Sequence, residues 1–199
     1  MSQPSLALTM ARLRRLGRGG GATLGQAAQL LAERSTPVLI MVLAALGMVP
    51  SPGLPLGFVC GAMVVWLAIA RLAGHEHAPI PQRLGRCPLP ASVLDAALRR
   101  LVPLLRKVER RASARLTPLA TGPGAMVAVV GIGLQGVVMA LPIPFGNVPP
   151  GLAILGLAGG LVWRDGLGVL AGHLLSLASF GIVGGMTWGA IAALEWLRV

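Results

Sequence analysis

The sequence predicts an all-α, polytopic membrane protein made of two related repeats, each containing a helix that is broken or re-entrant. Three observations predict this fold. Of the 199 residues, 55% are hydrophobic and 12% are charged, whereas a soluble domain carries about 25% charged residues. The basic residues gather beside the hydrophobic runs. Two of these runs are interrupted by clusters of proline and glycine, through which a helix cannot continue.

The two breaks lie at residues 50–55 and 142–151. Each separates apolar arms that are shorter than the ~20 residues a spanning helix needs. Backbone groups freed at membrane depth need protein or water partners, and in transporters such breaks often mark the binding site. A re-entrant hairpin and an ordinary hairpin with a proline-rich turn at the far surface both fit. The predicted structural breaks are at Pro50, Pro52, Pro142 and Pro144.

The chain divides into four parts by composition. The four are a basic N-terminus expected to be disordered (1–22), a first repeat (23–72), a cytosolic region with a basic amphipathic helix (73–122), and a second repeat with one or more C-terminal membrane helices (123–199). The first repeat opens with a short surface helix, for which Thr23 and Gln26 have the spacing of a capping box. The last hydrophobic run is long for one span and short for two, and its glycines near residue 184 offer a place to bend.

The net charge of +11 is concentrated beside the membrane segments. All of the 17 basic residues except Arg164 and Arg198 lie before residue 35 or between residues 71 and 115. Basic flanks predict that the N-terminus and the 73–122 loop are cytoplasmic. No recognition module accompanies the charge, so nucleic acid is not an expected partner. Residues 91–111 predict a basic amphipathic helix at an anionic lipid surface; its candidate headgroup contacts are Arg99, Arg100, Arg106 and Lys107.

The sequence contains no evident catalytic constellation. Its six acidic residues are scattered, and residues 75–77 form a short His-Glu-His cluster without a distant third ligand. Cys60 and Cys87 lie in different environments, which indicates two free thiols. We therefore expect no enzymatic activity, no metal and no cofactor.

Asn147 is the polar residue that stands out in the second break. Its side-chain oxygen is predicted to cap the following arm, and amides at the start of that arm could receive an anionic group such as a lipid phosphate. With Gly146 and Phe145 it forms the candidate substrate-binding site. His173 is a further candidate for substrate binding, because an ionisable residue inside a membrane segment is a functional candidate. The structural alternative is a neutral histidine that is hydrogen-bonded to a neighbouring helix.

Small residues recur at intervals of four in several apolar segments, including Gly156 with Gly160 and Gly168 with Gly172. This spacing permits close helix contact in lipid. Packing within one subunit explains it, and a homodimer through glycine-rich faces is the alternative, with the Gly181, Gly185 and Gly189 series among the candidates.

The second break carries a motif with a family resemblance. The run from Leu141 to Asn147, followed by an apolar arm and Arg164-Asp165-Gly166, is similar to the signature of the bacterial exopolysaccharide-synthesis ExoD family. The resemblance extends over residues 22–197 and departs from the family pattern at Ser51. Further agreement lies in Thr23-Leu24-Gly25, residues 50–54 and Thr121-Gly122-Pro123.

The resemblance implies a bacterial inner-membrane protein that supports exopolysaccharide production. Our leading hypothesis is transport or handling of a lipid-linked or anionic solute at the paired breaks. The alternative is a non-transporting scaffold whose basic helix positions the polysaccharide-biosynthesis proteins. Membrane lipids with anionic headgroups are expected partners in both cases.

Overall fold

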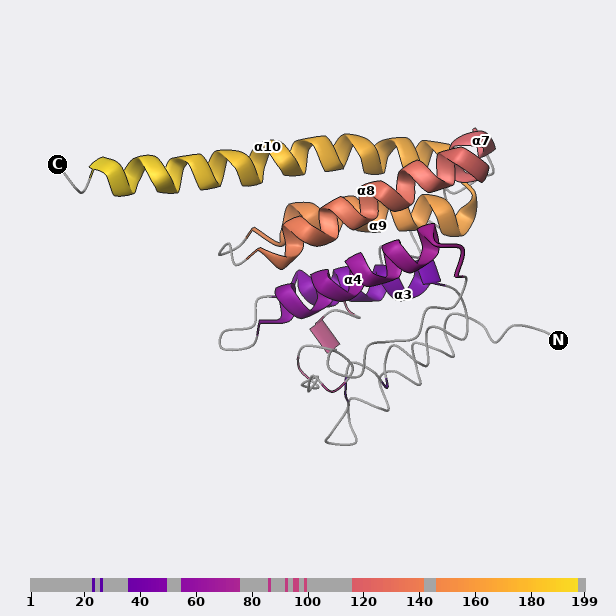
Figure 1. The fold of residues 1–199 in the computed structure, drawn as a ribbon, viewed down its shortest axis with the longest axis horizontal. Coiled ribbons are helices and arrows are strands. Elements are labelled where there is room, and N and C mark those ends of the chain that lie inside the picture. The colour runs from indigo at the N-terminus through magenta and orange to yellow at the C-terminus, as the bar shows by residue number, and fades with distance from the viewer. Residues whose placement is uncertain are drawn as a thin grey trace.

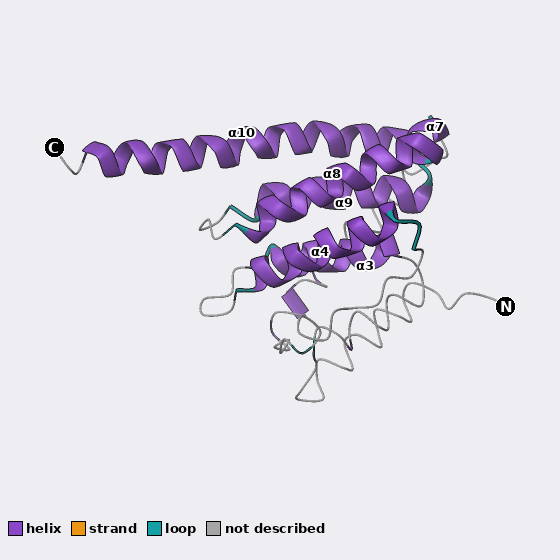
Figure 2. Cartoon of the chain, in the orientation of Figure 1, coloured by secondary structure: helices purple, strands orange, loops and turns teal. Residues whose placement is uncertain are grey.

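A computed structural model describes residues 36–49, 55–75, 116–141 and 146–196, together with the single positions 23, 26, 86, 92, 95, 96 and 99. The elements in these ranges are all helices, which confirms the all-α part of the predicted fold class (Figures 1 and 2). They are α3 (Thr36–Gly47), α4 (Leu56–Leu72), α7 (Thr117–Ala120), α8 (Gly122–Ala140), α9 (Val148–Trp163) and α10 (Gly166–Trp196).

Four of the helices form two antiparallel hairpins, α3 with α4 and α8 with α9. α4 packs against α8, and α3 packs against α9, so the hairpins close a four-helix ring. Both hairpins turn at the same end, because Met48 before the first break contacts Gly151 just after the second. α10 packs chiefly against α9 and continues well past the level of both turns (Figure 1).

The core of the ring is made by α3. Each of its twelve residues except Pro37 is buried, so α3 has no polar face to present to solvent. The other three helices of the ring contribute one face each to the core, including Met63 of α4, Ile132 of α8 and Leu157 of α9. A helix that is apolar all round is expected at the centre of a bundle or inside a membrane.

Glycine lets the helices approach closely at several of the positions where small residues recur four apart. A Cβ on Gly156 of α9 would lie 2.9 Å from the Cα of Gly172 of α10. On Gly61 of α4, a Cβ would lie 2.6 Å from the carbonyl oxygen of Gly136 of α8. The prediction of close packing within one subunit is therefore confirmed at these positions. Gly181, Gly184, Gly185 and Gly189 have nothing within 4 Å of such a Cβ.

The structure settles two boundaries that the sequence left open or misplaced. The last run, which could be one helix or two, is one continuous helix of 31 residues, α10, or about 46 Å at 1.5 Å per residue. The second break is shorter than predicted, because α9 begins at Val148 and includes Pro149 and Pro150 in its first turn. Proline fits there since the first amides of a helix have no intrahelical acceptor.

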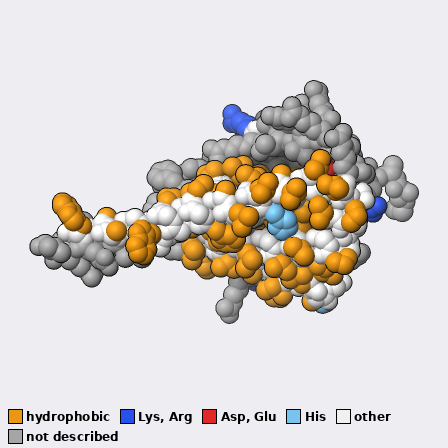
Figure 3. Space-filling model, turned by 90° about the horizontal axis from the view of Figure 1, so that it is seen from above, with side chains coloured by type: hydrophobic (Ala, Val, Ile, Leu, Met, Phe, Trp, Pro, Cys, Tyr) orange, Lys and Arg blue, Asp and Glu red, His pale blue; other side chains and the backbone are white. Residues whose placement is uncertain are grey.

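The described surface suits a membrane. Gly122–Ala140 and Gly166–Gly189 are long and apolar enough to span a bilayer, and only 33% of each window is buried. Large hydrophobic side chains such as Leu134, Leu174 and Leu177 are exposed on these helices. Figure 3 shows hydrophobic side chains over most of the face formed by the helices. A soluble protein would bury such helices, so the pattern indicates membrane insertion.

The capping box predicted near the N-terminus is confirmed. The Thr23 amide donates to Oε1 of Gln26 at 3.0 Å, and the Gln26 amide donates to Oγ1 of Thr23 at 3.3 Å. In the predicted basic helix, the described residues Ser92, Asp95, Ala96 and Arg99 are helical. The remainder of residues 91–111 lies outside the described residues.

Candidate binding site at the paired helix breaks

Residues that flank the two helix breaks lie together in space, and Asn147 makes the contact. The carboxamide of Asn147, in the second break, lies on the backbone of Gly57, in the first turn of α4 after the first break. A Cβ on Gly57 would be 2.9 Å from Cγ of Asn147, with Nδ2 closer still. Gly57 therefore has to be glycine for the carboxamide to occupy this position.

Asn147 does not cap α9 as predicted. It occupies the N-cap position, but its side chain makes no capping hydrogen bond, and its backbone is in the right-handed helical region with φ −81° and ψ −16°. A capping oxygen accepts from the amide two or three residues ahead. Those residues are Pro149 and Pro150, which carry no amide hydrogen.

The two prolines also weaken the predicted anion site at the start of α9. An anion at a helix N-terminus is held by the free amides of the first turn. Val148 retains an amide there, whereas Pro149 and Pro150 have none, and the Gly151 amide already donates to the Asn147 carbonyl at 3.1 Å. A phosphate would thus find few donors on α9.

The side-chain oxygen of Asn147 is buried without a partner. Its Oδ1 atom is inaccessible to solvent and finds no hydrogen-bond partner among the residues that the structure describes. Leaving a buried polar atom unpaired costs ~1–3 kcal/mol. In native proteins an unpaired group of this kind needs an explanation, and a ligand at the site is one.

The start of α4 lies beside this oxygen. Its N-cap residue is Pro55, which has no side-chain acceptor to offer. The Val59 amide donates to the Pro55 carbonyl at 3.0 Å, so the amides of Leu56, Gly57 and Phe58 have no acceptor within the helix. The junction therefore combines an unpaired acceptor from the second break with helix-terminal donors from the first.

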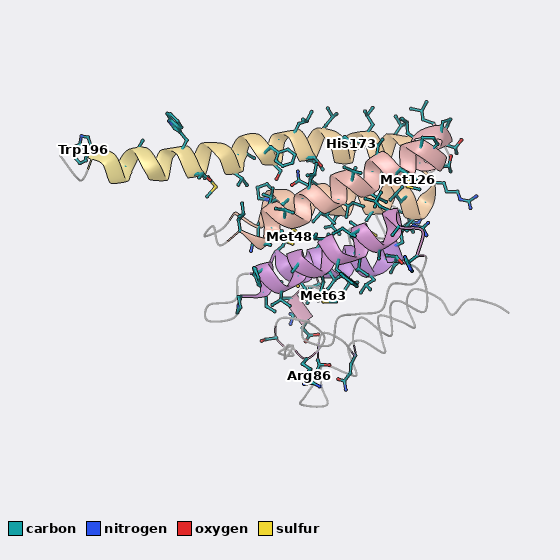
Figure 4. The ribbon with its side chains drawn as sticks, viewed as in Figure 1. Met48, Met63, Arg86, Met126, His173 and Trp196 are labelled. Atoms are coloured by element: carbon teal, nitrogen blue, oxygen red, sulfur yellow. The ribbon has the colours of Figure 1, made fainter. Side chains whose placement is uncertain are left out.

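His173 lies elsewhere, so the structure does not bring the predicted binding residues together. The imidazole of His173, on α10, lies beside Gly131 of α8, 3.3 Å from the position of a Cβ there (Figure 4). Gly131 is about 15 Å along α8 from the second break. Gly146 is buried next to Asn147. Phe145 and the four predicted break prolines lie outside the described residues.

A polar connection between α8 and α10 was missed by the sequence reasoning. Gln135 is fully buried; its Nε2 donates to the Ser176 carbonyl at 3.1 Å, and its Oε1 accepts from the Ser179 hydroxyl at 2.9 Å. The Ser176 hydroxyl donates to the Gly172 carbonyl at 2.9 Å. The available signal was a single amide side chain in an otherwise apolar 19-residue helix. Such residues commonly bond across helices in membranes.

Arg164 and Asp165 connect α9 to α10 at the end opposite the breaks. Arg164 adopts the left-handed conformation, with φ 51°, and the Asp165 amide donates to the Gly160 carbonyl at 2.9 Å. This is the hydrogen bond of a Schellman cap. Oδ1 of Asp165 then accepts from the Leu167 amide at 3.1 Å. Asp165 therefore caps the start of α10 with its side chain.

The predicted headgroup contacts are described only at Arg99. Its guanidinium lies 3.9 Å from Asp95 one turn earlier, and both side chains are largely exposed. An exposed pair of this kind contributes little to stability. Arg100, Arg106 and Lys107 lie outside the described residues. Within the described ranges, no group of three histidine, cysteine or acidic residues is close enough to hold a metal ion.

Comparison with known proteins gives one match. A family whose description is exopolysaccharide synthesis, ExoD, matches residues 6–185, which is most of the chain. No curated protein and no solved structure matches.

Proposed function

Because the chain belongs to the ExoD exopolysaccharide-synthesis family, we propose that it supports exopolysaccharide production by binding and moving a lipid-linked or anionic solute through the membrane. The site is the junction of the two breaks, formed by Asn147 and the start of α4. The observation that carries this proposal is the contact between Asn147 and Gly57, which brings two segments 90 residues apart in the chain to one place.

The arrangement of the hairpins supports this proposal. Helices α4 and α9, which follow the breaks, have 17 and 16 residues, or about 25 and 24 Å, less than the ~30 Å thickness of the hydrocarbon layer. The breaks then lie within or near the far side of the bilayer. Two hairpins with breaks at the same end are the arrangement of parallel repeats, and paired broken helices hold substrates in many transporters.

The charge distribution gives the proposed orientation. Arg71 and Arg164 lie at the ends of α4 and α9, on the side of the bundle opposite the breaks. With the basic residues between 71 and 115, they support a cytoplasmic location for this end. We propose that the protein lies in the inner membrane, with the breaks facing the periplasmic side or the membrane interior.

Transport by the purified full-length chain tests the proposal. We expect liposomes that contain the protein to move a fluorescent polyprenyl-phosphate-linked sugar between leaflets, and Asn147→Ala to slow this movement at least ten-fold. Gly181→Ala is the matched control, because a Cβ there meets nothing within 4 Å. Absence of both flux and binding with folded protein would overturn the proposal, as would normal flux in Asn147→Ala. A role as a scaffold would then be favoured.

A further inference from the structure

His173 of α10 is an ionisable residue in a membrane-spanning segment, and its side chain lacks a hydrogen-bond partner. The imidazole is half-buried and packs on Gly131 of α8 (Figure 4). The hydroxyls of Ser176 and Ser179, one and two turns farther along α10, form hydrogen bonds elsewhere. None of the residues that the structure describes forms a hydrogen bond with the imidazole. A partner therefore has to come from outside the helical bundle.

The depth of His173 limits what that partner can be. His173 lies seven positions after Gly166, the first residue of α10, which is about 10 Å along the helix axis. The hydrocarbon layer is ~30 Å thick, and the lipid headgroups lie outside it. With the Arg164 turn at the cytoplasmic surface, the imidazole lies within the hydrocarbon. Ionisable residues at such depth pair with other protein groups.

His173 belongs to a stripe of side chains along one face of α10. The stripe repeats at intervals of three and four residues, which is the spacing of a coiled-coil seam. All of its members except the half-buried His173 are exposed, and they are Leu170, His173, Leu177, Phe180, Gly184 and Thr187. The series Gly181, Gly185 and Gly189 lies farther around the helix. Lipid could cover an apolar stripe, but it offers no hydrogen bond to the histidine.

A second copy of the chain provides a polar partner at the matching level. Two copies insert in the same direction, because the same basic residues orient both. Two α10 helices that pair in parallel about a two-fold axis then bring each residue of the stripe against itself. A neutral imidazole has one donor and one acceptor nitrogen, so two of them can form a hydrogen bond. A single polar residue in a coiled-coil seam also fixes its register.

We propose that the chain forms a homodimer through parallel α10 helices, with the two His173 imidazoles hydrogen-bonded to each other at the two-fold axis. The stripe from Leu170 to Thr187 is the interface. This pairing is independent of the proposed transport. Flux by a monomeric protein would reject the dimer alone, and a dimer without flux would reject transport alone.

Counting photobleaching steps of the labelled full-length chain in liposomes, over a range of protein-to-lipid ratios, measures the pairing. We expect His173→Leu to raise the dissociation constant of the dimer about five-fold, as the loss of one polar bond between membrane helices allows. His173→Asn keeps a donor and an acceptor and should stay within two-fold of the wild type. Gly185→Ala, off the stripe and in open space, is the control. Monomers at every ratio, or equal pairing in the Leu variant, would overturn the inference.

A cysteine comparison leaves His173 in place and does not depend on the folding of the Leu variant. Cys60 and Cys87 are first replaced by alanine and serine, and a single cysteine is then placed at Gly184 or Gly185. Both positions have nothing within 4 Å of a Cβ, but only Gly184 lies on the stripe. Oxidation should cross-link two copies through Gly184→Cys and not through Gly185→Cys, because a disulfide needs Cα atoms within about 7 Å. Equal cross-linking at the two positions, or none at Gly184→Cys, would contradict the proposed interface.

Discussion

At the scale of single residues, the side chain of Asn147 packs on the backbone of Gly57 and does not cap the helix that follows it. The capping prediction considered the asparagine and overlooked the two prolines that follow it, which remove the amides a cap would bond. The contact with Gly57 depends on how the two hairpins pack, and no local pattern contains that information. Gln135 was missed for a similar reason, because its partners are on another helix.

The bond between Gln135 and Ser179 gives a prediction at this scale. We expect Gln135→Leu to lower the free energy of unfolding by about 0.5–2 kcal/mol, since the Ser179 hydroxyl loses its buried acceptor. A double-mutant cycle with Ser179→Ala, measured by unfolding in sodium dodecyl sulfate, isolates the pair. The double variant should cost less than the sum of the two single variants. Fully additive costs would show that the two side chains do not interact.

At the scale of elements, hydrophobic runs and proline positions predicted four of the helices and their hairpin connections well. Proline and glycine decide where a helix ends, so the breaks were visible in the sequence. The exact start of α9 was not predicted, because proline is equally compatible with a break and with a first turn. The choice between one and two C-terminal helices was left open, since glycine permits a bend in a helix without requiring one.

The contact between α9 and α10 provides an element-scale prediction. Gly156→Ala places a methyl group 2.9 Å from the Cα of Gly172, and backbone atoms cannot move aside as a side chain does. We expect a loss of about 1–3 kcal/mol in the free energy of unfolding, as for other overpacked sites. Gly185→Ala adds the same methyl group farther along α10, where nothing lies within 4 Å of it. It should leave stability unchanged or raise it slightly, and an equal loss in both variants would contradict this account.

At the scale of the whole molecule, composition predicted the membrane-protein class and the motif in the second break predicted the family. Composition works here because exposed apolar helices with few charges are stable only in lipid. The relative orientation of the two hairpins could not be predicted from the sequence, since inverted and parallel repeats have the same hydrophobic pattern. The structure places both turns at one end of the ring, and this makes a shared site at the breaks feasible.

The contact between Asn147 and Gly57 is the central claim, and a double-mutant cycle in stability tests it most directly. Gly57→Ala should destabilise the full-length protein by about 1–3 kcal/mol, because the new Cβ collides with the carboxamide. Asn147→Ala removes the colliding atoms, so the double variant should be more stable than Gly57→Ala alone when unfolding is followed by circular dichroism in sodium dodecyl sulfate. Costs that simply add would show that the two residues are not in contact, and the two breaks would then have no common site.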